Sequence, residues 1–156
     1  MVSVRSKKRD NLKTHPLNRQ HYQYVVNHMR WWDEMEIMLQ GYTKKRMLDM
    51  FDDLHGVSAT HGDIPVLCAG YQTFPNVYWY WFIATPMVAE HFVDITRNAQ
   101  KMIEKNEQET PDARHIVQVW NKHQHSIKWL NILNFKQFSS FNVGNEQILL
   151  VERKRT

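Results

Sequence analysis

The sequence holds one cysteine, Cys68, among its 156 residues, so an internal disulfide is excluded. Cys68 lies in an apolar run, where we expect a buried, unreactive thiol rather than a nucleophile. No apolar run approaches the roughly 18–20 residues that span a bilayer, and no apolar segment follows the basic residues at the N-terminus. The chain is therefore expected to be neither secreted nor membrane-spanning.

Acidic charge is in the minority, because 20 Lys and Arg residues face 16 Asp and Glu residues. Part of the basic excess gathers at the ends, in Arg5, Lys7, Lys8, Arg9, Arg153, Lys154 and Arg155. No zinc-finger, RNA-recognition or helix-turn-helix pattern accompanies it, so nucleic-acid binding is not expected. The length and the 42% of hydrophobic residues indicate one domain over 1–156, with basic ends that we expect to be flexible.

Hydrophobic periodicity predicts the order of elements. Strands are predicted at 2–5, 57–61, 64–71, 77–84, 116–120, 137–142 and 147–152, and helices at 18–29, 31–39, 43–55, 86–105 and 126–135. Further predictions are a turn at His15-Pro16, Gly56 as a helix stop, and a loop over 106–112. Strand, long helix and strand at 77–119 form a parallel crossover within an otherwise antiparallel sheet. The fold class is thus α+β, with a mostly antiparallel sheet of six or seven strands and helices on both faces.

The segment 116–135, IVQVWNKHQHSIKWLNILNF, carries the clearest likeness to a known family. It consists of a β-branched strand, Asn121, a polar turn, a helix with Ser126 as its expected cap, and a closing Asn134-Phe135. This order resembles the end of a GNAT (GCN5-related N-acetyltransferase) domain, in which the fifth strand bulges at an Asn. The whole element order is similar to that fold.

The resemblance implies acetyl-CoA chemistry, but the residues that the family uses for it are largely missing. The family binds pyrophosphate with a glycine-containing loop, which falls here on 85–90, TPMVAE. That loop has no glycine, Pro86 has no N–H, and Glu90 adds negative charge. The tyrosine that protonates the leaving thiolate in the family falls on Leu130. Asn134 replaces the family's glycine and can still adopt a left-handed helix end.

The strand 77–84 contains no carboxylate or histidine, so Tyr78 and Tyr80 are the candidate catalytic residues. The resemblance places a relic acetyl-CoA cleft at Ile83, Ala84, Ala89, Asn121 and Ser126. Asn121 either marks this cleft, where the family's pantetheine arm pairs with exposed backbone, or is a polar strand terminator. We weigh the two equally.

Two further patterns have a structural and a functional interpretation. His123 and His125 could lie on one face, but a turn does not guarantee it, and we expect no metal site. Trp31 and the residues after it could form a partner-binding knob, although a buried position for Trp31 is favoured.

The chain also looks like the small degenerate GNAT-like internal virion proteins of short-tailed bacteriophages. The likeness rests on Tyr80 to Thr85 (YWFIAT) and on Val119 to Leu130 (VWNKHQHSIKWL). It implies a protein of the virion or host cytoplasm that acts through contacts with phage or host proteins. The alternative is an active N-acetyltransferase that moves an acetyl group from acetyl-CoA to an amine.

Overall fold

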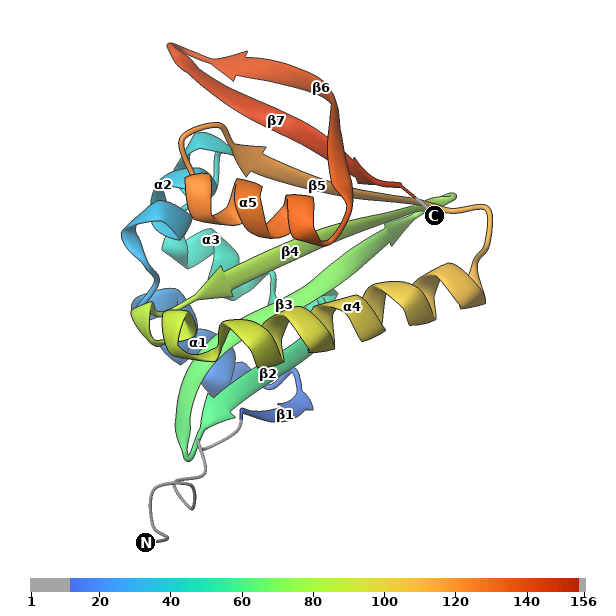
Figure 1. Ribbon diagram of the computed structural model, residues 1–156. Helices are drawn as coiled ribbons and strands as arrows, with labels where there is room; N and C mark the ends of the chain where they lie inside the picture. The colour runs from blue at the N-terminus through green and yellow to red at the C-terminus, as the bar shows by residue number, and fades with distance from the viewer. Residues whose placement is uncertain (1–11, 155–156) are drawn as a thin grey trace, which may run out of the picture.

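Seven strands form one sheet in the order β1-β2-β3-β4-β5-β7-β6 in the computed structural model, which describes residues 12–154 (Figure 1). The strands are β1 (Lys13–Pro16), β2 (His55–His61), β3 (Ile64–Phe74), β4 (Val77–Ala84), β5 (Arg114–Trp120), β6 (Phe135–Val143) and β7 (Glu146–Arg153). Only β4 and β5 pair in parallel; every other neighbouring pair among the described strands is antiparallel. The predicted crossover and the predicted fold class are confirmed.

The helices form two layers, one on each face of the sheet (Figure 1). They are α1 (Arg19–Asn27), α2 (Trp31–Leu39), α3 (Lys44–Asp49), α4 (Phe92–Glu109) and α5 (Gln124–Ile132), with 3₁₀ turns η1 (Phe51–Asp53) and η2 (Pro86–His91). Trp81 and Ile83 of β4 pack with α1, α2 and α3, whereas Tyr80 and Phe82 pack with α4 and α5. Both faces of β4 are therefore covered, as its nearly continuous apolar run predicts.

The predicted turn at His15-Pro16 is wrong, because both residues belong to β1 and pair with Ser58 and Val57 of β2. Proline is tolerated there because β1 is an edge strand, in which an N–H can be absent without breaking the sheet. The strand predicted at 2–5 lies outside the described residues. No described helix is long and apolar enough to cross a membrane.

Gly56 does not stop a helix; it lies in β2, and the helix predicted over 43–55 ends at Asp49, followed by η1. Gly56 stands opposite Gly70 of β3, and a Cβ at Gly56 would lie 2.2 Å from the carbonyl oxygen of Ala69. Close approach of the two backbones therefore requires glycine here, a reason that local helix signals do not reveal.

Two helix boundaries also differ from prediction. The segment after Pro86 begins as the 3₁₀ turn η2, and α4 then continues to Glu109, so the predicted loop at 106–112 is half helical. At α5 the capping side chain is that of His123, which accepts the Ser126 N–H at 3.4 Å. Ser126 is therefore inside the helix, and its predicted capping role is wrong. Asn134 does adopt the left-handed conformation, with φ 65°.

Candidate functional site

Strands β4 and β5 run side by side for half of their length and then part. Their parallel register extends from Val77 opposite Arg114 to Tyr80 opposite Val117, and the register of the described strands includes no later pair. We call this stretch the paired half. The remaining ends, 81–84 of β4 and 118–120 of β5, form the open half. Backbone groups that would otherwise pair across the open half need other partners.

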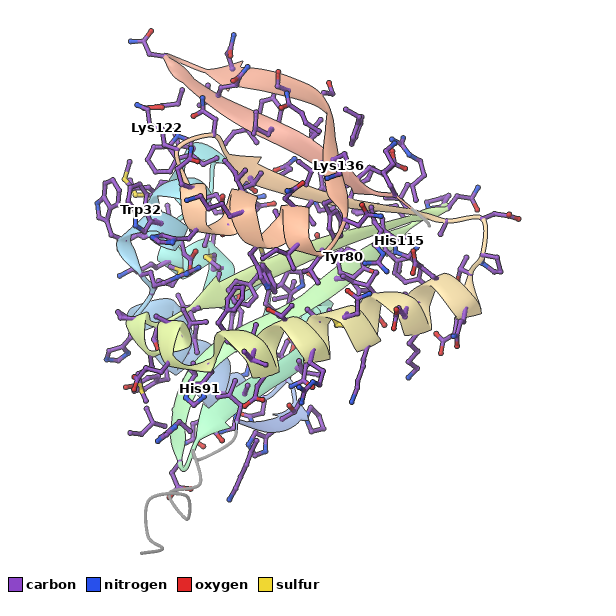
Figure 2. The ribbon with its side chains drawn as sticks, in the orientation of Figure 1. Trp32, Tyr80, His91, His115, Lys122 and Lys136 are labelled. Carbon is purple, nitrogen blue, oxygen red and sulfur yellow. The ribbon has the colours of Figure 1, made fainter. Side chains whose placement is uncertain are left out.

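The paired half holds a buried network of hydrogen bonds between side chains. The Tyr80 hydroxyl lies 2.8 Å from Nδ1 of His115 and accepts from Nδ2 of Asn106 at 3.1 Å. Tyr78 stacks on the His115 ring, with centroids 5.1 Å apart, and its hydroxyl lies 2.9 Å from Oγ1 of Thr110. Figure 2 shows Tyr80 and His115 next to each other. Burial raises the pKa of Tyr80 above its ordinary value, so this hydroxyl is a weak acid.

The open half is bridged by two carboxylates from α2. Asp33 Oδ2 accepts the backbone N–H of Ala84, at the end of β4, at 2.9 Å. Glu36 Oε2 accepts the backbone N–H of Trp120, at the end of β5, at 2.8 Å. The backbone N–H of Arg30 donates to the Ala84 carbonyl at 2.8 Å. Two side chains one helical turn apart on α2 therefore provide hydrogen-bond acceptors for backbone N–H groups of the parted strands.

Asp33 is the centre of this arrangement and is only 2% exposed. The Arg30 guanidinium donates to both of its oxygens, at 2.8 and 3.0 Å, in a bidentate pair. His123 at the start of α5 is fully buried, and its Nε2 lies 3.0 Å from Asp33 Oδ1. The partners of the carboxylate thus come from β4 and from the residues that precede α2 and α5, and a buried charge needs such partners.

Glu36 is the titratable group at this place whose environment most changes its acidity. The pKa of Glu36 is raised to about 8, chiefly by burial and to a smaller extent by the nearby Asp33, against the opposing effects of the Trp120 N–H and the charge of Arg30. Near neutral pH the Glu36 side chain therefore exchanges a proton readily. A carboxyl group whose pKa lies near neutral pH can accept and donate a proton, as a general acid-base catalyst must.

The loop after β4 offers few amides to a phosphate. It folds as η2, whose capping residue Thr85 accepts the Met87 N–H at 3.3 Å with its hydroxyl and the Val88 N–H at 3.1 Å with its carbonyl. Ala89 and Glu90 are exposed on this turn. Pro86 has no N–H, so the first donors of the turn are absent or already engaged.

A cleft of about 1200 Å³ is lined by side chains of both helical layers and of the sheet, among them Glu36 of α2, Met47 of α3, Ala99 of α4 and Trp129 of α5. Trp129 crosses from α5 to α4: its indole N–H donates to Oγ1 of Thr96 at 3.0 Å, and its ring lies 5.1 Å from that of Phe82. The cleft is roomy but mostly apolar.

Ligand atoms of Asp33, Glu36 and His123 lie within 4.8 Å of one another. Both Asp33 oxygens already accept from Arg30, whose guanidinium would repel a cation, so this set suits an ion pair better than a metal. His125 is exposed while His123 is buried, so these two histidines do not converge. The Ser126 hydroxyl and Asp33 both lie 3.0 Å from the same nitrogen, Nε2 of His123. That geometry differs from a catalytic triad, in which Ser and Asp use opposite nitrogens.

The structure separates the sequence-predicted site residues. Tyr78 and Tyr80 lie in the paired half, Ile83 and Ala84 in the open half, and Ala89 on η2. Asn121 follows β5, and its backbone N–H donates to Gln147 of β7 at 3.0 Å. Its side-chain amide donates to the Gln147 side chain at 3.4 Å, so both bonds lead away from β4. Asn121 therefore faces the opposite side of β5 from the open half.

Sequence reasoning missed Asp33 and Glu36 as site residues. The available signal was the spacing of Asp33 and Glu36, because residues three apart share one face of the Trp31–Leu39 helix. The buried position favoured for Trp31 is wrong: Trp31 is 58% exposed, while its ring contacts those of Trp32 and Trp120 at 4.6 and 5.9 Å. Figure 2 shows Trp32 at the α2 end of the sheet.

The sequence matches no family model and no curated protein. Solved structures are similar in fold. A GNAT-family acetyltransferase from Bacillus anthracis superposes with a TM-score of 0.67 at 13% identity, covering 93% of this chain and 95% of that one. The ribosomal-protein-S18-alanine N-acetyltransferase from Escherichia coli gives 0.67 at 10% identity, covering 91% and 92%. The ribosomal L7/L12 α-N-protein acetyltransferase RimL gives 0.68 at 8% identity, covering 93% and 91%.

The fold is therefore that of the GNAT acetyltransferases, over nearly the whole length of these chains. At such low identity the likeness defines the fold alone. The function has to be argued from the open half.

Proposed function

We propose that this protein uses the GNAT fold to bind other proteins and has given up the acetyl-CoA site. The observation that carries the proposal is the occupancy of the open half: Asp33 and Glu36 hold the backbone N–H groups of Ala84 and Trp120. In the fold family, the cofactor's pantetheine arm pairs with exposed backbone where these strands part. Here the chain's own carboxylates use those donors.

The surroundings support the same proposal. The turn η2 has no glycine and its first amides are engaged by Thr85, so pyrophosphate would have few donors. Trp129 joins α5 to α4 through Thr96 across the groove beside β4. Leu130, where the family has its proton donor, is buried and apolar.

The outer face of α2 is the surface that we assign to protein contact. Trp31 and Met38 are seven residues apart, so they lie on one helical face, and they are 58% and 59% exposed. Exposed Trp and Met are typical anchors of protein interfaces. Following the resemblance, we place this contact in a phage particle or an infected cell, with a phage or host protein as partner.

Calorimetric titration with acetyl-CoA tests the loss of the cofactor site. We expect no heat and no shift in Tm at millimolar cofactor, whereas micromolar affinity would overturn the proposal.

Trp31→Ala is expected to weaken partner binding by at least about tenfold, as for an interface anchor. Phe74→Ala, at a similarly exposed aromatic residue on β3, is the matched control and is expected to have no effect.

The second candidate is an N-acetyltransferase, and the acidity of Glu36 favours it. With a pKa of about 8 in a cleft of about 1200 Å³, Glu36 could accept the proton of an attacking amine. The amine nitrogen would bond to the thioester carbonyl carbon, the C–S bond would break, and the thiolate would take a proton through water from Tyr78, the less buried of the two tyrosines.

A thiol-release assay with acetyl-CoA and a panel of amines separates the two candidates. The enzyme candidate requires turnover that Glu36→Gln removes by at least about a hundredfold. Glu34→Gln, on the same helix but bridged to Lys44 at the surface, should leave the rate unchanged. Absence of turnover with every amine leaves the protein-binding proposal standing.

A further inference from the structure

The two edges of the sheet are protected very differently. Edge strand β1 has four residues, including Lys13 and Pro16, and both short length and these residue types discourage strand addition. Edge strand β6 has nine residues and no proline, and the chain carries no charge from Gln137 to Asn145. A long, uncharged edge strand has a row of free N–H and C=O groups that readily pair with another strand.

The surface of β6 is exposed as well as its edge. Phe138 is 42% and Phe141 is 39% exposed, and the β6–β7 ribbon extends beyond the helical layers (Figure 1). β7 pairs with β5 on its other side, so β6 is the outermost strand of the described seven-stranded sheet. A further strand along β6 would extend this sheet.

A β-bulge limits which part of β6 can pair. The register with β7 shifts between Gln137 and Ser139, which leaves Phe138 unpaired in the bulge, and Gly144 turns the chain with φ 61°. The regular stretch between them is Ser139 to Val143, five residues centred on Phe141. An odd number of residues has a central one, which can lie on a two-fold axis between identical antiparallel strands.

We propose that two copies of this chain associate by antiparallel pairing of β6 with β6, with Phe141 at the two-fold axis. Phe141 then faces Phe141 of the second copy, Ser139 faces Val143, and Ser140 faces Asn142. Alternation in a strand puts Phe141 and Val143 on one face and Ser140 and Asn142 on the other. On one face the Phe141 pair is flanked by Ser139 opposite Val143, and on the other face Ser140 meets Asn142, with which it can hydrogen-bond.

A second copy can pair with this edge, because the two identical strands place no like charges opposite each other. Like charges directly opposite each other destabilise a strand pair, and this stretch has no charge. An isologous interface of this kind closes after two copies and does not continue into a filament. The inference depends on the β6 edge alone and stands or falls independently of the proposed function.

Sedimentation analysis of the full chain tests the dimer. We expect a species of twice the chain mass of 18.8 kDa, which Phe141→Lys converts to monomer because it sets two ammonium groups face to face. Phe74→Lys, on an exposed β3 residue away from this edge, should remain dimeric. A monomeric unmodified chain, or a dimer that Phe141→Lys leaves intact, overturns the inference. Circular dichroism confirms that each variant is folded.

Disulfide trapping tests the register without depending on a disruptive variant. Directly opposite residues have Cβ atoms about 4.5–5.5 Å apart, so Phe141→Cys should cross-link the two copies under mild oxidation. Asn142→Cys faces Ser140 and should cross-link at least about tenfold more slowly. Cys68 does not interfere, because it is buried and its pKa is raised to about 12. Equal cross-linking at positions 141 and 142, or none at 141, contradicts the register.

Discussion

The two halves of the β4–β5 pair solve the same problem, buried polar groups between strands, by different means. In the paired half the backbones of the two strands hydrogen-bond to each other, and the side chains of Tyr80, His115 and Asn106 form a network beside them. In the open half the strands part, and the carboxyl groups of Asp33 and Glu36 accept the backbone N–H groups instead. The first half is held by direct pairing of the two strands, whereas the second depends on side chains supplied by a third element, α2. The open half should therefore be the one that mutation and pH disturb most.

The largest effect is expected for Asp33→Ala. The change leaves the Ala84 N–H, the Arg30 guanidinium and buried His123 without their acceptor, and breaking a buried ion pair costs about 3–5 kcal/mol of unfolding free energy. Urea unfolding measures the loss. Glu34→Ala on the exposed side of α2 is the control and should cost less than about 0.5 kcal/mol. If Glu34→Ala lowered the unfolding free energy as much as Asp33→Ala, the loss could not be assigned to the Asp33 contacts that hold the open half.

A smaller, pH-dependent effect is expected from Glu36. Its folded pKa of about 8 lies above the ordinary 4.5, so the folded state holds a proton that the unfolded state has released between these values. The contribution of Glu36 to stability is therefore complete below about pH 4.5 and is lost as the pH rises through about 8. Unfolding free energies across this window should fall with pH, and Glu36→Gln should flatten that slope. An unchanged slope in Glu36→Gln would contradict the assignment.

In the paired half, Tyr80→Phe should cost about 1–2 kcal/mol, because Asn106 loses its acceptor and His115 loses its hydroxyl partner in a buried network. Tyr78→Phe, at a half-buried hydroxyl bonded to Thr110, is the matched control and should cost less. Thermal unfolding followed by circular dichroism compares the two. A loss larger than that of Asp33→Ala would reverse the ranking of the halves.

The smallest effect is expected for Asn121→Ala, which lies just beyond the open half but faces β7. Its backbone bond to Gln147 survives the change, so the cost should be below about 0.5 kcal/mol, with no change in partner binding. Chemical denaturation and a binding assay measure both quantities. A stable variant that no longer functions would instead make Asn121 part of a site.

Local patterns predicted those elements whose causes are local. The bounds of α2 and β4 are as predicted, and Asn134 takes the left-handed form expected of a helix end. The open half could not be predicted in the same way. Asp33 is 51 residues from Ala84 and Glu36 is 84 residues from Trp120. The local sequence around one residue of each pair therefore cannot predict its hydrogen-bond partner. Likewise, Gly56 was predicted to end a helix, because its close contact with Gly70 involves a different strand and leaves no signal in the local sequence.

The position of α2 also determines how strongly a soluble molecule would have to bind in order to enter the open half. Asp33 and Glu36 belong to the same polypeptide as the strands that they bridge, so their effective concentration is fixed by the tether and does not change with dilution. A cofactor must compete with this constant intramolecular occupant, and its apparent affinity falls by the fraction of molecules in which α2 has moved aside. Any molecule that drew α2 away from the sheet would therefore couple its own binding to the release of the backbone N–H groups of Ala84 and Trp120.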